Sequence, residues 1–171
     1  TGNTPGKLVV DPRTLNPTFN EVVRGVYGDD LTFDVPFVDG LKMRIGAKLE
    51  DDQIVLRPGA GYHTAIVAEL IGDDAYRYRL PDVGDRNTGV LEIAKRPVVV
   101  ELLDFNRRYG DPVWPIPMVI DNLVTGDARP SGFTFQVTAA GKPAQILVDR
   151  TPVGTYTIRV TSLDDPNYTL A

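Results

Sequence analysis

The sequence predicts an all-β fold, built as two small antiparallel β modules in tandem that lie end to end. Three observations lead to this class. Short runs alternate apolar and polar residues, which is the period of a strand with one buried face. Glycine and proline, 16 and 14 of the 171 residues, cluster between these runs as turn formers. Finally, a set of short motifs occurs twice in the same order along the chain.

The predicted strands follow from the alternating runs. They cover residues 31–35, 76–80, 89–93, 98–103, 133–137 and 156–160. Residues 41–52 are the best helix candidate, because Leu41, Ile45 and Leu49 recur every four residues, but Gly46 weakens a helix and a pair of strands is the alternative. Short strands at this spacing are typical of an immunoglobulin-like sandwich or a β-grasp-like sheet, and both topologies remain open.

The repeated motifs divide the chain. Tyr27 starts a Tyr-Gly-Asp motif that returns at Tyr109, 82 residues later. Residues 6–10 match residues 89–93 at an offset of 83, and Tyr76 matches Tyr168 at an offset of 92. We therefore expect a lead-in strand from a preceding repeat at 1–11, one β module at 12–94 and a second at 95–171. Residues 95–97 are the predicted joint.

The repeated turn motif consists of Tyr27, Gly28 and Asp29 in the first copy and Tyr109, Gly110 and Asp111 in the second. Glycine permits a positive φ angle, and an aspartate side chain can accept a hydrogen bond from nearby backbone. The tyrosines are expected to cover the end of each module's core. The motif therefore predicts a structural turn rather than a contact site.

Composition excludes several function classes. The net charge is −5, which disfavours nucleic acid, because binding it requires an excess of Lys and Arg. The apolar runs are too short to insert into a membrane. The chain has no cysteine, and its one histidine, His63, lacks the sequence context of a catalytic triad. No phosphate-binding glycine loop is present. We therefore expect a protein that is not an enzyme.

No metal site or cofactor is predicted from the acidic residues. Aspartate pairs occur in several turns, but none belongs to a calcium-binding loop of alternating acidic residues that ends in glycine. Asp82 and Asp85 come closest to such a pattern. Ca²⁺ at a joint between modules stays an open alternative, beside the simpler interpretation of solvated turn carboxylates.

Three aromatic residues are the candidate binding residues. Trp114 is the only tryptophan and stands among three prolines, in a segment that cannot donate every ladder hydrogen bond. Tyr76 and Tyr78 alternate with arginines. If exposed, such rings can stack on a sugar or anchor a protein partner. The alternative for Trp114 is packing against its own or a neighbouring module.

The second copy carries most of a family resemblance. Its segments 109–112, 122–127, 153–158 and 167–168 read Tyr-Gly-Asp-Pro, Asn-Leu-Val-Thr-Gly-Asp, Val-Gly-Thr-Tyr-Thr-Ile and Asn-Tyr. This pattern resembles the MBG domain of the Tyr-Gly-x type, which occurs in tandem in large bacterial surface and secreted adhesins. The resemblance supplies no catalytic residues.

The resemblance implies a function for the whole chain. It implies a non-catalytic stalk or spacer, secreted or on the bacterial cell surface, that supports cell adhesion or biofilm formation. The expected partners are neighbouring repeats, and extracellular polysaccharide or a host or cell-surface protein. A carbohydrate- or protein-binding module that uses Trp114, Tyr76 and Tyr78 is the alternative.

Overall fold

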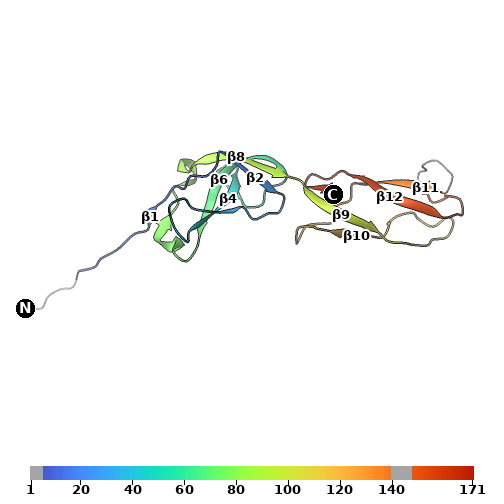
Figure 1. Ribbon diagram of the computed structural model, residues 1–171, viewed down its shortest axis with the longest axis horizontal. Helices are drawn as coiled ribbons and strands as arrows, with labels where there is room; N and C mark the ends of the chain where they lie inside the picture. Colours follow the sequence, from blue (N-terminus) through green and yellow to red (C-terminus); the bar gives the residue numbers. More distant parts are fainter. Residues whose placement is uncertain (1–5, 140–147) are drawn as a thin grey trace, which may run out of the picture. The chain divides into compact units, whose positions relative to one another are not determined.

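The computed structural model of the chain describes residues 6–139 and 148–171 (Figure 1). Almost all its regular structure is β, which agrees with the fold class that the sequence predicts. The chain divides into two compact units, Thr1–Ile93 and Ala94–Ala171, hereafter unit 1 and unit 2. Each unit is described by itself below.

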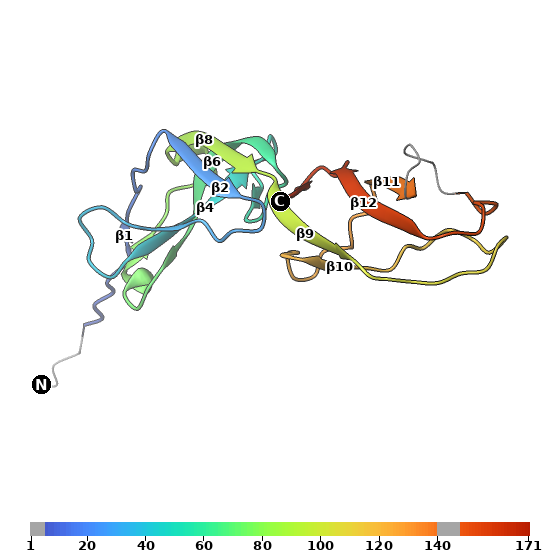
Figure 2. The same cartoon turned by 45° about the vertical axis from the view of Figure 1, so that its right-hand side comes forward.

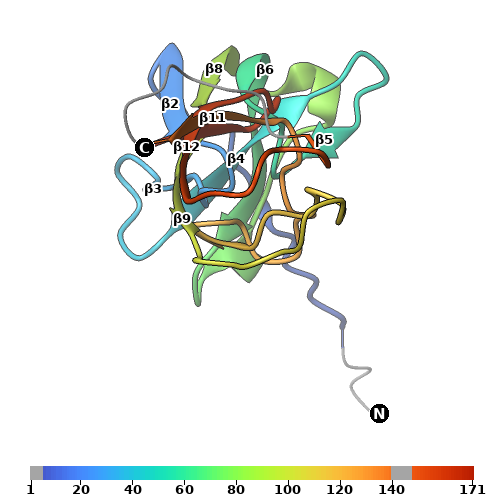
Figure 3. The ribbon, with the colours of Figure 1, turned by 90° about the vertical axis from the view of Figure 1, so that its right-hand side faces the viewer.

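Unit 1 is built around one large sheet. Its strands run in the spatial order β2-β8-β6-β4-β3, with β5 paired to β4, and a separate parallel pair joins β1 to β7. Figure 3 shows β8 between β2 and β6. The bounds are β1 Arg13–Thr14, β2 Val22–Val26, β3 Thr32–Asp34, β4 Lys42–Lys48, β5 Ile54–Val55, β6 Gly61–Ile71, β7 Tyr78–Arg79 and β8 Thr88–Ala94, with 3₁₀ turns at Ala75–Arg77 and Val83–Asp85.

Of the two alternatives for residues 41–52, the helix is wrong, because this segment contains strand β4 and the turn that follows it, and β5 begins just after it at Ile54. Leu41, Met43 and Ile45 alternate with more exposed residues and are at most 3% exposed, so the burial period is two rather than 3.6. Gly46 fits the strand, since a Cβ atom there would lie 2.8 Å from Ile54 Cγ2. The glycine lets β5 approach β4 closely.

Two further expectations for unit 1 concern its edges. Residues 6–11 lie in no sheet, and residues 1–5 lie outside the described part. A lead-in strand at 1–11 would pair with the preceding repeat to which it was assigned, so it stays a prediction. The strand expected at 76–80 is reduced to β7, because residues 75–77 form a 3₁₀ turn.

The described residues of unit 2 form two smaller sheets. One has the order β10-β9-β13 and the other pairs β11 with β12 (Figure 2). The bounds are β9 Arg96–Leu102, β10 Met118–Asp121, β11 Phe133–Ala139, β12 Tyr156–Leu163 and β13 Tyr168–Leu170. Because β9 begins at Arg96, only Lys95 lies outside a strand between β8 and β9, and the expected three-residue joint is shorter than predicted.

The two units repeat the same β-bulge. In unit 1, Arg44 pairs with Glu69 while Ile45 pairs with Val67, which leaves Ala68 as the extra residue. In unit 2, Thr134 pairs with Ser162 while Phe135 pairs with Val160, which leaves Thr161 as the extra residue. The bulge aligns β4 with β11 and β6 with β12, the latter at an offset of 93 residues.

The units also repeat a parallel strand pair, which corrects one sequence match. In unit 1 Arg13 pairs with Tyr78, and in unit 2 Arg96 pairs with Tyr168. Tyr78 is therefore the counterpart of Tyr168, whereas the sequence matched Tyr76. The tyrosine matched from the sequence lies two residues before the true counterpart, because strand pairing, rather than residue identity, decides which of the two tyrosines enters the sheet.

Candidate functional site

The candidate site in unit 2 is a shallow apolar groove beside Trp114, hereafter the Trp114 groove. It has a volume of about 440 Å³. Trp114 is 58% exposed, although Val113 and Ile116 on either side are buried and hold the segment to the unit. The groove is lined chiefly by Trp114, Ile116, Met118, Arg129, Phe133 and Phe135.

Strand β11 provides the other rings of the groove. Phe133 and Phe135 are two residues apart, so both side chains leave the same face of the strand. The Phe135 ring centroid lies 5.2 Å from that of Trp114 and 6.3 Å from that of Phe133, and both pairs are tilted. These spacings fall in the range of favourable aromatic pairs, so the three rings form one supported cluster.

Arg129 is the charged group of the Trp114 groove. Its Nη2 donates a 2.7 Å hydrogen bond to the main-chain oxygen of Met118, which fixes the guanidinium at the groove. A partly exposed indole beside a held guanidinium combines an apolar surface with a donor to carboxylates. The groove is thus suited to a ligand with an apolar face and acidic or hydroxyl groups.

The other two candidate binding residues lie in unit 1 and differ from each other. Tyr76 is 71% exposed, and the Arg77 guanidinium lies 5.6 Å from its ring centroid. Arg77 Nε also donates a 3.2 Å hydrogen bond to the Tyr76 hydroxyl, which raises the pKa of Arg77 together with nearby Asp74. Tyr78, in contrast, is half-buried and packs against the core of unit 1.

The Tyr-Gly-Asp motif forms the same turn in both units. Gly28 and Gly110 have φ angles of 85° and 89°. The amide of Asp29 donates to the Val26 carbonyl at 2.9 Å, and that of Asp111 to the Arg108 carbonyl at 3.1 Å. Each turn thus places glycine at the position that requires a positive φ.

The aspartates of these turns are used internally. Asp29 Oδ2 accepts from the Val26 amide at 3.3 Å, and Asp111 Oδ2 accepts from the Arg108 amide at 2.9 Å. Tyr27 packs against the core as expected. Tyr109 does not, since it is 64% exposed. The two turns therefore share their backbone structure but not the role of the tyrosine.

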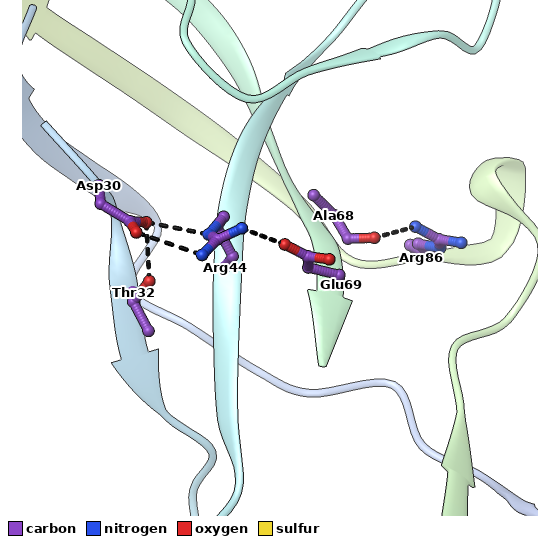
Figure 4. A network of polar contacts seen from close by, with 6 residues as sticks. All are labelled: Asp30, Thr32, Arg44, Ala68, Glu69 and Arg86. Atoms are coloured by element: carbon purple, nitrogen blue, oxygen red, sulfur yellow. Dashed lines mark hydrogen bonds and ion pairs between the residues drawn. The ribbon is translucent and has the colours of Figure 1, made fainter. Parts of the chain in front are cut away.

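A charged network crosses the sheet of unit 1 (Figure 4). Arg44 on β4 donates to both carboxylate oxygens of Asp30, at 3.0 and 3.2 Å, and also pairs with Glu69 on β6. The Thr32 hydroxyl donates to Asp30 at 2.8 Å. The hydrogen bond from Thr32 and the charge of Arg44 lower the pKa of Asp30. Asp30, two residues before β3, and Glu69 on β6 are therefore both ion-pair partners of Arg44 on β4.

Sequence reasoning missed two parts of the structure. One is the pair Phe133 and Phe135, whose period-two spacing predicted a strand but not that its rings meet Trp114. The other surrounds Tyr168, which is 3% exposed. Its hydroxyl donates to Asp127 at 2.6 Å and accepts from the Val124 amide at 3.0 Å. The closing Asn-Tyr motif thus has a structural role within unit 2.

His63 Nε2 lies 2.7 Å from the main-chain oxygen of Gly59. Within residues 6–139 and 148–171, no group of three or more His, Asp or Glu side chains is arranged to hold a metal ion. The same residues contain no helix with the length and apolar character that crossing a membrane requires.

Comparison of the chain with protein-family models, with curated proteins and with solved structures finds no match.

Proposed function

We propose that this chain is a non-catalytic pair of repeat modules that serves as a spacer in a secreted or cell-surface bacterial adhesin. In this role it supports cell adhesion or biofilm formation. The MBG-like motifs of the second module support the proposal, and neighbouring repeats are the expected partners within the same protein. The same proposal includes an immunoglobulin-like or a β-grasp-like topology for each module.

The observation that carries the proposal is the recurrence of three local structures. The glycine turn follows Tyr27 in unit 1 and Tyr109 in unit 2. The bulge lies opposite the start of β4 in unit 1 and opposite the start of β11 in unit 2. Both also join their first strand in parallel to a strand that begins with tyrosine. A spacer gains length by repeating one module, so a repeated design is what this role requires.

The spacer role is tested by surface labelling of cells that make the protein. Antibodies against this chain should label intact cells, or the culture medium if the protein is secreted. Deleting the two modules while keeping the rest of the protein should reduce adhesion or biofilm mass. Labelling that appears only after lysis contradicts the proposal, as does unchanged adhesion after the deletion.

A carbohydrate-binding role is the second candidate, and the Trp114 groove favours it. The apolar face of a sugar ring can stack on the exposed indole while Arg129 meets an acidic group. Binding to polysaccharides with and without uronic acids tests this role. Trp114→Ala should weaken binding at least about 10-fold, whereas Tyr62→Ala, which removes a 76% exposed ring from unit 1, should not. Equal loss in both variants, or no binding by the parent chain, contradicts it.

A further inference from the structure

The loop between β3 and β4 presents a phenylalanine side chain to solvent. Phe37 is fully exposed, and its φ angle of 62° lies in the left-handed region, where a bulky residue is an outlier. Two other described residues without a glycine have a positive φ, Asp52 and Asn122, and their types tolerate it. Glycine would adopt this conformation without strain. The chain has phenylalanine here despite both costs, which indicates a use for the ring.

The loop is fixed to unit 1 on both sides of Phe37. Val35 is 4% exposed and Leu41 1% exposed, and Val38 packs against the core. The Val38 amide donates to the Val35 carbonyl at 3.3 Å, and the Val35 amide donates to the Leu41 carbonyl at 2.9 Å. The backbone beneath the ring is thus held in place, so the ring can enter a partner without the cost of ordering a loop first.

A carboxylate follows the exposed ring closely. Asp39 is exposed and stands two residues after Phe37. Among the residues that the structure describes, its side chain takes part in no ion pair. Asp34, the acidic residue on the other side of the loop, lies opposite Lys42 in the register of β3 and β4. Asp39 is therefore the charge that remains for a partner, and the loop fits an apolar pocket with a cation at its rim.

The Trp114 groove of unit 2 has both of these properties. It is lined by the rings of Trp114, Phe133 and Phe135, and Arg129 is its charged group. Within the described part of the chain, the Arg129 guanidinium pairs with no carboxylate. All the lining residues lie between Trp114 and Phe135, so one internal segment of unit 2 forms the groove.

We propose that the Trp114 groove binds Phe37 of a second copy of this chain. Asp39 of that copy then pairs with Arg129. The Trp114 and Phe135 rings already meet in a tilted arrangement at 5.2 Å, and a third ring can add to them in the same way. The inference goes beyond the spacer role and stands without it, because it rests on an exposed ring and a groove that match each other.

The charge distribution favours a contact between unlike units. Unit 1 has 15 acidic and 10 basic residues, whereas unit 2 has eight of each. Two copies of unit 1 therefore repel each other, while unit 1 of one copy and unit 2 of another do not. The contact joins two different surfaces, so it can continue head to tail from copy to copy. One ring and one ion pair make a small and weak contact, so self-association is measured at chain concentrations up to about 1 mM.

Sedimentation equilibrium of the parent chain and of Phe37→Gly tests the role of the ring. Glycine relieves the strain at a φ of 62°, so the variant keeps its fold. Its dissociation constant should rise at least about 10-fold, because a buried ring is lost from the contact. Tyr62→Ala, which removes a 76% exposed ring from the same unit, is the control and should change the constant less than about 2-fold. Equal weakening by both variants, or a parent chain that stays monomeric, overturns the proposal.

Mixing two variants identifies both surfaces. Phe37→Gly keeps the groove and Trp114→Ala keeps the Phe37 loop, so neither variant should associate with itself through this contact. Their mixture should form a heterodimer that grows no further, because each chain then has one working surface. A mixture without heterodimers contradicts the proposal, as does undiminished self-association of Trp114→Ala alone. Binding of polysaccharide at the groove by a chain that stays monomeric also contradicts it and leaves the groove to the carbohydrate role.

The ion pair is tested by Asp39→Lys. At low ionic strength this variant should raise the dissociation constant at least about 3-fold, because two positive charges then meet. The effect should shrink in about 1 M salt, which screens exposed charges. Asp11→Lys makes the same change in net charge at another exposed position of unit 1 and is the control. An equal effect of the two changes overturns the pairing of Asp39 with Arg129.

Discussion

Replacing Leu91 by alanine tests whether β8 is a core strand of unit 1. The side chain is 0% exposed. The change removes three buried carbon atoms, worth about 0.8 kcal/mol each in transfer free energy, and leaves a cavity that adds further cost. The expected loss is about 3–4 kcal/mol in the free energy of unfolding. For a unit of this size, that lowers the melting temperature by roughly 12–30 °C.

The matched control is Val90→Ala on the same strand. Val90 is 41% exposed, so its truncation should cost less than about 1 kcal/mol. Chemical unfolding followed by circular dichroism gives both free energies, and amide hydrogen exchange locates the loss to β6 and β8. The reasoning is refuted if Leu91→Ala costs less than about 1 kcal/mol, or if the two variants cost the same.

Three further predictions concern single residues. Gly110→Ala should destabilise unit 2 by about 1–2 kcal/mol, because its φ of 89° strains any residue with a Cβ atom. Calorimetry measures this loss. The control variant is Gly84→Ala, where a Cβ atom meets nothing within 4 Å. Ile158→Ala should cost less than half as much as Leu91→Ala in chemical unfolding, because Ile158 is only half-buried whereas Leu91 is 0% exposed; an equal cost contradicts this. The pKa of Asp30 in the folded chain is lowered from its ordinary value of 3.8, so its ionised carboxylate stabilises the fold at pH values above 3.8, and this stability is lost as the pH falls through the lowered pKa. The contribution is less than about 1 kcal/mol, because the side chain is 60% exposed. In acid-unfolding curves, the Asp30→Asn variant should therefore lose less stability than the parent chain as the pH falls.

Local patterns were sufficient to predict the strands whose apolar face is regular. The alternating runs at 133–137 and 156–160 became β11 and β12. The segment at 41–52 was ambiguous because Leu41 and Ile45 satisfy a period of four and a period of two at once. The structure resolves it through Met43, which is 3% exposed, and Leu49, which is 41% exposed. Burial on alternate residues decides for the strand.

The candidate site could be predicted only in part. Trp114 was identified from its isolation among prolines, but its partner Phe135 lies 21 residues away, and only the packing of β11 brings the rings together. The grouping of Trp114 with Tyr76 and Tyr78 rested on residue type alone. Tyr78 lies in a sheet and packs against the core, whereas Tyr76 is exposed, because the pairing of β7 with Arg13 and Thr14 includes only one of these two tyrosines, which are two residues apart.

Amide hydrogen exchange along β6 and β12 tests the central claim that the two units are copies of one module. The shared register leaves Ala68 and Thr161 as the extra residues of the two bulges. The amides of both residues should exchange faster than those of the paired residues beside them, because the extra residue of a bulge is left out of the ladder. Fast exchange at one of the two positions and slow exchange at the other would contradict the claim.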